Sequence, residues 1–284
     1  MNLSRRSFAA LALSAGLAPI GSALSGCTGG APKESGSNGT TSSPAGALRA
    51  GVRADVMGFG YLNEKTDKYY GLEIDIVHEL AERMGETDVA FITVTPDDRK
   101  EMLLEGDIDL ICACYSIADS RLENFDFSPA YYTDQVIAVV QNSSMITAIE
   151  GMRGRTFGTM SGSNAAPLLS TKLYEIGMSD GEVVSANDDN SDVTFKTWHL
   201  LQFPSYRELS DALEVGTVDA MVLDGAIAKT YLNDKRSVIE GFDVAEQSYG
   251  IATQKGSELS TSVAQVVQDM LDDGTIDALV DKWD

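Results

Sequence analysis

Two matching stretches decide the fold: residues 106–111 read Gly-Asp-Ile-Asp-Leu-Ile, and residues 216–221 read Gly-Thr-Val-Asp-Ala-Met. Each stretch follows a segment with helical spacing of apolar residues, at 98–105 and 206–215, and glycine is the residue type that most often ends a helix. The apolar run around each aspartate is typical of a strand buried in a parallel sheet. A helix–strand unit that occurs twice predicts two sheets of similar build, and hence two α/β lobes.

Other periodic segments complete the α/β pattern. Ser205 and Glu208 have the spacing of a capping box, which predicts where the second helix starts. The remaining elements are expected as strands at 48–52, 89–94, 108–115, 136–140, 218–223 and 249–253, and as helices at 75–84, 263–271 and 276–283.

Two of these strands, 136–140 and 249–253, are expected to cross between the lobes. The first lobe is then discontinuous in sequence, because its last helices come from the C-terminus. Two crossings make a hinge, and a hinge makes a cleft. The predicted lobes are lobe 1, residues 48–140 and 250–284, and lobe 2, residues 141–249.

The first 26 residues have the features of an export signal. A pair of arginines, Arg5 and Arg6, precedes a short apolar stretch, and small residues lead to Cys27. The arginine pair resembles a twin-arginine signal, and the Leu-Ser-Gly-Cys run resembles the bacterial lipobox. We therefore expect cleavage after residues 1–26, acylation of Cys27, and a flexible tether over 27–47 that holds the protein at the outer face of the cell membrane. An uncleaved signal anchor is the alternative, although its apolar run is short for a spanning helix of about 20 residues.

The charge excludes one class of partner. The formal net charge is −22, and loss of the two leader arginines makes it −24 (−22 − 2). Such a field repels nucleic acid, so no nucleic-acid partner is expected. An anionic ligand needs arginines close to its binding site.

No metal or other cofactor is expected. The two histidines, His78 and His199, are far apart in the sequence. Cys112 and Cys114 are expected to be small core residues on one face of a strand, too close for an unstrained bridge. The acidic stretch 185–192 lacks the glycine and terminal glutamate of a calcium loop, and a solvated loop is expected there.

A set of stretches in a fixed order carries a family resemblance. They are residues 51–61, 71–75, 106–111, 116–121, 126–132, 218–224, 249–251 and 273–283. Together they resemble the family 3 extracellular solute-binding proteins, the receptors for polar amino acids in ATP-driven importers. The resemblance implies a two-lobed type II periplasmic-binding-protein fold with two hinge crossings. It also implies a monomer that binds an amino acid in the cleft between the lobes, delivers it to an ABC permease, and is not an enzyme.

The resemblance also implies an amino-acid clamp. Arg121 falls where the family's arginine grips the ligand α-carboxylate, and Asp224 matches the carboxylate that receives the ammonium group. Ser116 matches a hydroxyl residue that bonds the ligand backbone. Cys114 stands where the family has a glycine whose carbonyl accepts from the ammonium, and Phe59 matches an aromatic that packs on the ligand. Without the resemblance, Arg121 could be a solvated loop residue and Asp224 a helix cap.

Further residues are assigned to carboxylate binding and selectivity. Ser163 and Asn164 precede a helix start, where free N–H groups attract a carboxylate, and match the family's second carboxylate contact. Arg53 and Arg99 can point into the side-chain pocket, which favours a ligand side chain with carboxylate or amide oxygens. Glutamate or aspartate therefore ranks first, glutamine next and basic amino acids last. A surface ion pair is the alternative for these two arginines.

Two other classes of function remain open. Related scaffolds resemble cyclohexadienyl or arogenate dehydratases, whose site needs an acid–base residue aimed at a ring substrate. Asp224 and Glu73 are the acids available for that role. A ligand-sensing module that acts with a separate receptor is the other alternative.

Overall fold

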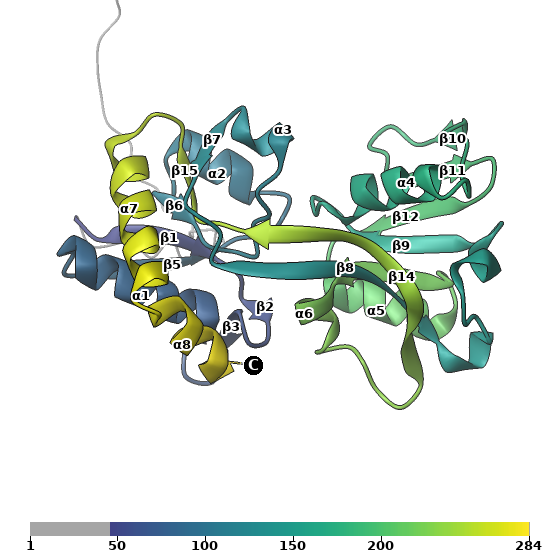
Figure 1. The fold of residues 1–284 in the computed structure, drawn as a ribbon, viewed down its shortest axis with the longest axis horizontal. Helices are drawn as coiled ribbons and strands as arrows, with labels where there is room; N and C mark the ends of the chain where they lie inside the picture. The colour runs from purple at the N-terminus through teal and green to yellow at the C-terminus, as the bar shows by residue number, and fades with distance from the viewer. Residues whose placement is uncertain (1–45, 284) are drawn as a thin grey trace, which may run out of the picture. The chain divides into compact units, whose positions relative to one another are not determined.

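A five-stranded sheet and a seven-stranded sheet form most of the protein in a computed structural model, which describes residues 46–283 (Figure 1). The five-stranded sheet has the order β5-β1-β6-β15-β7. Its strands are β1 (Leu48–Val52), β5 (Val89–Thr93), β6 (Leu110–Ile111), β7 (Phe125–Phe127) and β15 (Ala252–Gln254). Its first three strands are parallel, and β15 runs antiparallel to both of its neighbours.

Helices from both ends of the described chain cover this sheet. They are α1 (Leu72–Met84), α2 (Arg99–Glu105), α3 (Asp119–Leu122), α7 (Glu258–Asp272) and α8 (Thr275–Trp283). Helix α1 packs against both C-terminal helices. A small third sheet, of β2 (Asp55–Val56), β3 (Gly60–Asn63) and β4 (Lys68–Tyr70), adjoins α1. The C-terminal helices thus belong with the N-terminal strands, as the sequence predicts.

The seven-stranded sheet has the order β10-β11-β12-β9-β13-β8-β14. Its strands are β8 (Tyr132–Gln141), β9 (Thr156–Met160), β10 (Val183–Ala186), β11 (Asp192–Phe195), β12 (His199–Phe203), β13 (Ala220–Asp224) and β14 (Arg236–Tyr249). Its helices are α4 (Ala165–Glu175), α5 (Tyr206–Val215) and α6 (Gly225–Ala228). Side chains alternate along β13, because Met221 and Leu223 pack in the cluster that contains α5, whereas Ala220 and Val222 pack in the cluster that contains α4. The sheet is therefore buried on both faces.

Two long strands, β8 and β14, run side by side between the sheets (Figure 1). They pair antiparallel from Tyr132 opposite Tyr249 at one end to Gln141 opposite Arg236 at the other. Residues 136–140, assigned to lobe 1 from the sequence, pair with β13 inside the seven-stranded sheet. An apolar strand looks the same in either sheet, so the sequence pattern could not assign it.

Local signals predicted several elements well. Helix α5 spans the predicted residues, and Ser205 Oγ accepts from the Glu208 N–H at 3.1 Å. Glycines end α1, α2 and α5 in the left-handed conformation, as their sequence positions indicate. Helix α1 begins at Leu72, three residues before the predicted start.

Two predicted strands are wrong in extent. The strand predicted at 108–115 is reduced to β6, because the chain leaves the sheet before Cys114, whose φ is 46°. The strand predicted at 249–253 is divided between the end of β14 and β15, with Gly250 and Ile251 in between. Both errors have one cause. The residues stay buried beyond the point where strand pairing ends, and an apolar run in the sequence indicates burial but not pairing. The acidic stretch 185–192, expected to be a loop, lies partly in the exposed β10–β11 hairpin.

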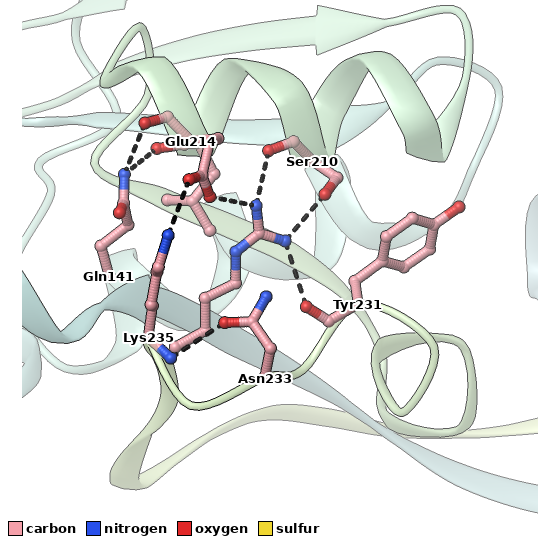
Figure 2. A network of polar contacts seen from close by, with 8 residues as sticks. Gln141, Ser210, Glu214, Tyr231, Asn233 and Lys235 are labelled. Carbon is pink, nitrogen blue, oxygen red and sulfur yellow. Dashed lines mark hydrogen bonds and ion pairs between the residues drawn. The ribbon is translucent and has the colours of Figure 1, made fainter.

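A buried arginine joins α5 to the start of β14 (Figure 2). Arg236 is 9% exposed and donates to Ser210 Oγ at 2.7 Å, to the Ser210 carbonyl at 3.0 Å and to the Tyr231 carbonyl at 3.1 Å. It also pairs with Glu214 Oε2 at 3.2 Å. Gln141, at the end of β8, also bonds to α5, because its amide donates to the carbonyls of Leu213 and Glu214 at the end of that helix.

The predicted leader, Cys27 and the tether up to residue 45 lie outside the described residues. Between residues 46 and 283 no helix combines the length and apolar character needed to cross a membrane.

Candidate functional site

The loop that follows β6, residues 113–116, is the centre of the candidate site. Arg99 Nη1 donates to the Ala113 carbonyl at 2.7 Å, and Arg121 Nη1 donates to the Ser116 carbonyl at 2.8 Å. The Cys114 N–H donates to Glu73 Oε1 at 2.5 Å. The loop thus brings two of the predicted arginines to one place.

Both arginines lie against the ring of Tyr115. The guanidinium carbon of Arg121 is 4.2 Å from the ring centroid and that of Arg99 is 4.3 Å from it. Arg99 is 3% exposed, and its Nε has no hydrogen-bond partner among residues 46–283. Burial lowers the pKa of Arg99 to about 10, with Arg121 and Arg53 adding to the effect. Burial also lowers the pKa of Arg121. The site therefore holds desolvated positive charge.

Arg53 adds a third guanidinium. It is 3% exposed and pairs with both oxygens of Asp55, at 2.9 and 2.7 Å. Its guanidinium carbon lies 5.5 Å from the ring centroid of Tyr206, the first residue of α5. Arg53 therefore contacts a residue attached to the other main sheet, and its burial argues against the alternative of a surface ion pair.

Asp224 ends β13 and supplies the acid. It is 7% exposed, its Oδ2 accepts from the Tyr249 hydroxyl at 2.5 Å, and its Oδ1 accepts from the Gln247 amide. Burial raises its pKa to about 6, and the nearby Asp134 carboxylate also raises it. Although Asp224 stands at the N-cap position of α6, its side chain makes no capping hydrogen bond.

A hydrogen-bond chain connects the acid to the arginine loop. Ser116 Oγ donates to Gln247 Oε1 at 2.7 Å, and Gln247 in turn donates to Asp224. The Tyr249 backbone also forms an isolated bridge with Ser116. Gln247 on β14 thus connects Ser116, which follows the five-stranded sheet, to Asp224 in the seven-stranded sheet.

Phe59 lies in an aromatic cluster at the same place. It is 7% exposed, and its ring meets Tyr132 edge-on at 5.0 Å and Tyr249 at 6.0 Å. Tyr132 and Tyr249 stack on each other at 5.9 Å. The cluster forms an apolar wall beside Asp224, because Tyr249 belongs to both.

Within the described range no hydrogen bond or ion pair joins Ser163 or Asn164 to Arg121 or Asp224. Ser163 Oγ donates to the Met160 carbonyl at 2.7 Å, and Asn164 is the N-cap residue of α4 without a side-chain cap bond. The loop after β9 that contains them nevertheless contacts the segment before α2, which belongs to the other main sheet, because Ser161 Oγ donates to Asp97 Oδ1 at 3.0 Å. Gly162 lies so close to Asp97 that a Cβ on residue 162 would be 2.7 Å from Asp97 Oδ1.

A pocket of about 340 Å³ opens beside Tyr115 and Arg121. Its lining includes Asp97, from the segment before α2, and Gly162, from the loop after β9. Arg121, the predicted partner of the ligand carboxylate, therefore lines a pocket to which both main sheets contribute residues.

Sequence reasoning missed several residues of the site. Glu73, considered only as an acid for a rival enzyme, is fully buried and accepts from the Cys114 N–H and the Tyr131 hydroxyl, both at 2.5 Å. Burial raises its pKa, which favours the neutral acid, and its Oε2 has no partner in the described part of the chain. Gln247 and Tyr206 carry no local signal, because their importance comes from long-range contacts.

The cysteines are buried free thiols, and burial raises the pKa of both well above the usual value. Between residues 46 and 283 no group of three or more His, Cys, Asp or Glu side chains could hold a metal ion. His78 is exposed and packs edge-on against Phe91 at 5.0 Å.

Comparisons with known proteins agree with this architecture. The ABC transporter glutamine-binding protein GlnH of Bacillus subtilis is 28% identical over 238 residues, covering 82% of this chain and 79% of the relative. The glutamine-binding protein of Geobacillus stearothermophilus is 29% identical, covering 74% and 73%. The glutamate-binding protein GluB of Corynebacterium glutamicum is 25% identical, covering 83% and 77%.

Solved structures have the same fold. An ancestral arginine-binding protein bound to arginine gives a TM-score of 0.68 at 27% identity, covering 84% of this chain and 98% of the other. An ancestral arginine-binding protein bound to glutamine gives a TM-score of 0.67 at 26% identity, covering 84% and 97%. The fold is the two-lobed type II periplasmic-binding-protein fold, with β8 and β14 as its two crossings. A sequence profile matches residues 48–284, and the chain belongs to the bacterial extracellular solute-binding proteins, family 3.

Proposed function

We propose that the protein is the substrate-binding component of an amino-acid ABC importer. The observation that carries the proposal is the chain from Ser116 through Gln247 to Asp224, because it brings an acid from one sheet to the loop that holds Arg121. An amino acid has a carboxylate and an ammonium group on one carbon. Arg121 and Asp224 are the matching pair of charges.

The ligand proposed first is glutamate or aspartate, and glutamine comes next. Arg53 and Arg99 are buried around the loop and Arg121 is half-buried, and within residues 46–283 the pair of Arg53 with Asp55 is their only ion pair. Buried charge without a counter-ion is costly, so a ligand that brings a second carboxylate stabilises the site. Relatives named for binding glutamine or glutamate support a ligand of this size and polarity, and they do not rank one above the other.

Basic amino acids rank last despite the arginine-bound structural relatives. A cationic side chain in this pocket would face Arg53 and Arg99 across a poorly solvated space, where like charges repel strongly. Glu73, whose pKa burial raises, already accepts from the Cys114 N–H and the Tyr131 hydroxyl.

The mechanism proposed is closure of two lobes around the ligand. Ligand docks on the 113–116 loop, and the part that carries Asp224 and Tyr206 closes over it, with β8 and β14 as the hinge. Ser163 and Asn164 are proposed to complete carboxylate binding in the closed form. The closed monomer would be recognised by the ABC permease, and no reaction on the ligand is required.

The protein is proposed to act at the outer face of the cell membrane, held by acyl chains on Cys27. This proposal comes from the leader sequence alone. Mass spectrometry of the mature protein would show two or three acyl chains on Cys27 if it holds, and an unmodified or uncleaved N-terminus would contradict it.

A thermal-shift panel of the twenty amino acids tests the ligand. A ligand at a hundred times its dissociation constant adds about 2.7 kcal/mol, which moves the midpoint by roughly 5 to 10 °C for a domain of this size. We expect a shift with glutamate or aspartate, a smaller one with glutamine and none with arginine. The shift should disappear in Arg121→Ala. A panel without any shift would contradict the proposed function.

A further inference from the structure

Glu73 lies where several segments of the candidate site meet. It is in the first turn of α1 and is fully buried. Its N–H donates to the Phe59 carbonyl at 3.1 Å. Its Oε1 accepts from the Cys114 N–H and from the Tyr131 hydroxyl, both at 2.5 Å. One buried acid therefore bonds to the backbone of Phe59 and to the loop that follows β6.

The loop that Glu73 contacts has an unfavourable backbone conformation. Cys114 has a φ of 46°, in the left-handed region that disfavours a residue with a Cβ. Among residues 46–283, the other non-glycine residues with positive φ are Asp67, Met145 and Asn190, and all of them are exposed, whereas Cys114 is buried. Such a conformation persists only where surrounding contacts hold it. The hydrogen bond to Glu73 is a contact of this kind, made at the turn itself.

The turn at Cys114 sets the directions of the carbonyls that hold two arginines of the site. The Ala113 carbonyl accepts from Arg99 Nη1 at 2.7 Å. On the other side of the turn, the Ser116 carbonyl accepts from Arg121 Nη1 at 2.8 Å. A change of φ at Cys114 would rotate the peptide that carries the Ala113 carbonyl relative to the rest of the loop. Both arginines therefore keep their arrangement only while the turn is held.

We propose that Glu73 is a positioning residue for ligand binding, which holds the left-handed turn at Cys114 and thereby keeps Arg99 and Arg121 where one ligand can meet both. The inference rests on the proposed function, to which it adds a residue that acts through the loop and not by touching the ligand. The competing interpretation is that Glu73 only stabilises the fold. That interpretation predicts a lower unfolding midpoint in Glu73 variants and an unchanged affinity.

Two replacements of Glu73 separate its hydrogen bonds from its bulk. Glu73→Gln keeps the oxygen that both donors use, and Oε2, which becomes the amide nitrogen, has no hydrogen-bond partner within residues 46–283. Glu73→Met removes the acceptor. Affinity is measured by titration calorimetry with glutamate, or with the amino acid that gives the largest thermal shift. We expect a loss of about tenfold or more in Glu73→Met and a change of less than about threefold in Glu73→Gln.

Cys114→Gly provides the readout that a purely structural role would not change. Glycine adopts the left-handed conformation freely, so the turn no longer needs Glu73 to hold it. In the Cys114→Gly background we expect Glu73→Met to weaken binding less than about threefold, compared with about tenfold in the wild-type background. If Glu73 acts only on the fold, the factor is the same in both backgrounds.

Asp109→Leu is the matched control. Asp109 also accepts a backbone N–H, that of Arg49 at 2.8 Å, but it directly precedes β6, whereas the loop of the site follows that strand. We expect Asp109→Leu to lower the unfolding midpoint and to change affinity less than about threefold.

If Glu73→Met does not fold, Glu73→Asp takes its place, because it withdraws the carboxyl group by one methylene from the Cys114 N–H. The same loss of affinity and the same rescue by Cys114→Gly are then expected. An affinity that Glu73 replacement leaves unchanged, or a loss of equal size in both backgrounds, overturns the inference and leaves the proposed function intact. A wild-type protein that binds none of the twenty amino acids overturns both.

Discussion

Two buried arginines, Arg236 and Arg99, show how the protein treats the same charge in two places. Arg236, at the start of β14, makes four hydrogen bonds to Ser210, Tyr231 and Glu214. Arg99, at the start of α2, makes one hydrogen bond within residues 46–283, to the Ala113 carbonyl, and packs against the Tyr115 ring. Arg236 has a carboxylate partner within its own part of the chain, whereas no ion pair with Arg99 is present in the region 46–283.

The difference suggests separate roles: Arg236 stabilises the fold, whereas Arg99 is available to a ligand. A buried charge with a carboxylate partner stabilises the packing around it, while one without a partner costs free energy until something supplies the missing charge. The lowered pKa of Arg99, about 10, reflects that cost, since burial and the neighbouring arginines disfavour its charged form. We therefore expect a ligand carboxylate to gain most at Arg99.

Replacing Arg99 should have the largest effect on binding. Arg99→Met removes the proposed partner of the side-chain carboxylate, and losing one member of a buried charge pair costs about 2 to 5 kcal/mol. We expect affinity for the acidic ligand to fall at least 30-fold in titration calorimetry. The midpoint of thermal unfolding without ligand should stay the same or rise, because an unpaired buried charge has been removed.

Replacing Arg236 should have the opposite pattern, with a smaller effect. Arg236→Met removes the donor that Arg236 supplies to the Ser210 and Tyr231 carbonyls and to Glu214, which keeps only the longer pair with Lys235. This loss should cost about 2 kcal/mol and lower the midpoint by roughly 4 to 8 °C. Ligand affinity, measured below the melting transition, should change less than threefold. If both variants lost binding and stability together, the distinction between the two arginines would be wrong.

The smallest effect expected is the pH dependence of binding through Asp224. Its pKa of about 6 in the ligand-free protein should fall when an ammonium group binds, so affinity is constant above pH 7 and decreases below pH 6. Between pH 7 and pH 5 we expect a loss of about tenfold by calorimetry. Asp224→Asn should bind more weakly at every pH and show a flat profile, and a wild-type profile equally flat would exclude Asp224 as the ammonium partner.

The same carboxyl affects stability with the opposite sign. Because its folded pKa, about 6, lies above the ordinary 3.8, Asp224 contributes stability at pH values below 3.8 and loses that contribution as the pH rises through 6. Asp224→Asn should therefore raise the unfolding midpoint of the ligand-free protein at pH 7 and leave it nearly unchanged at pH 3.5. The site thus carries both an acid and an arginine at a cost to the ligand-free fold.

Local signals in the sequence predicted the parts of the molecule that depend on local physics. Helix α5 with its Ser205 cap was predicted residue by residue. The ligand roles of Arg121 and Asp224 came from the family resemblance and stay predictions. The left-handed turn at Cys114 was not predicted, since an apolar run gives no indication of where the chain leaves a sheet.

The long-range parts of the site could not be predicted. Gln247 lies in a strand of alternating exposure and joins Ser116 to Asp224 only because the last part of β14, residues 245–249, pairs with the start of β8. Tyr206 was recognised as a helix start, and its contact with Arg53 depends on how the two sheets meet. Pairings between distant segments decide both, and periodicity within a segment does not encode them.

A crystal structure of the protein grown with aspartate tests the central claim most directly. We expect the α-carboxylate of the ligand within hydrogen-bond distance of the Arg121 guanidinium, its ammonium group on Asp224, and its side-chain carboxylate on Arg99. A bound amino acid that touches neither Arg121 nor Asp224 would contradict the claim that opposite charges from the two lobes hold the ligand.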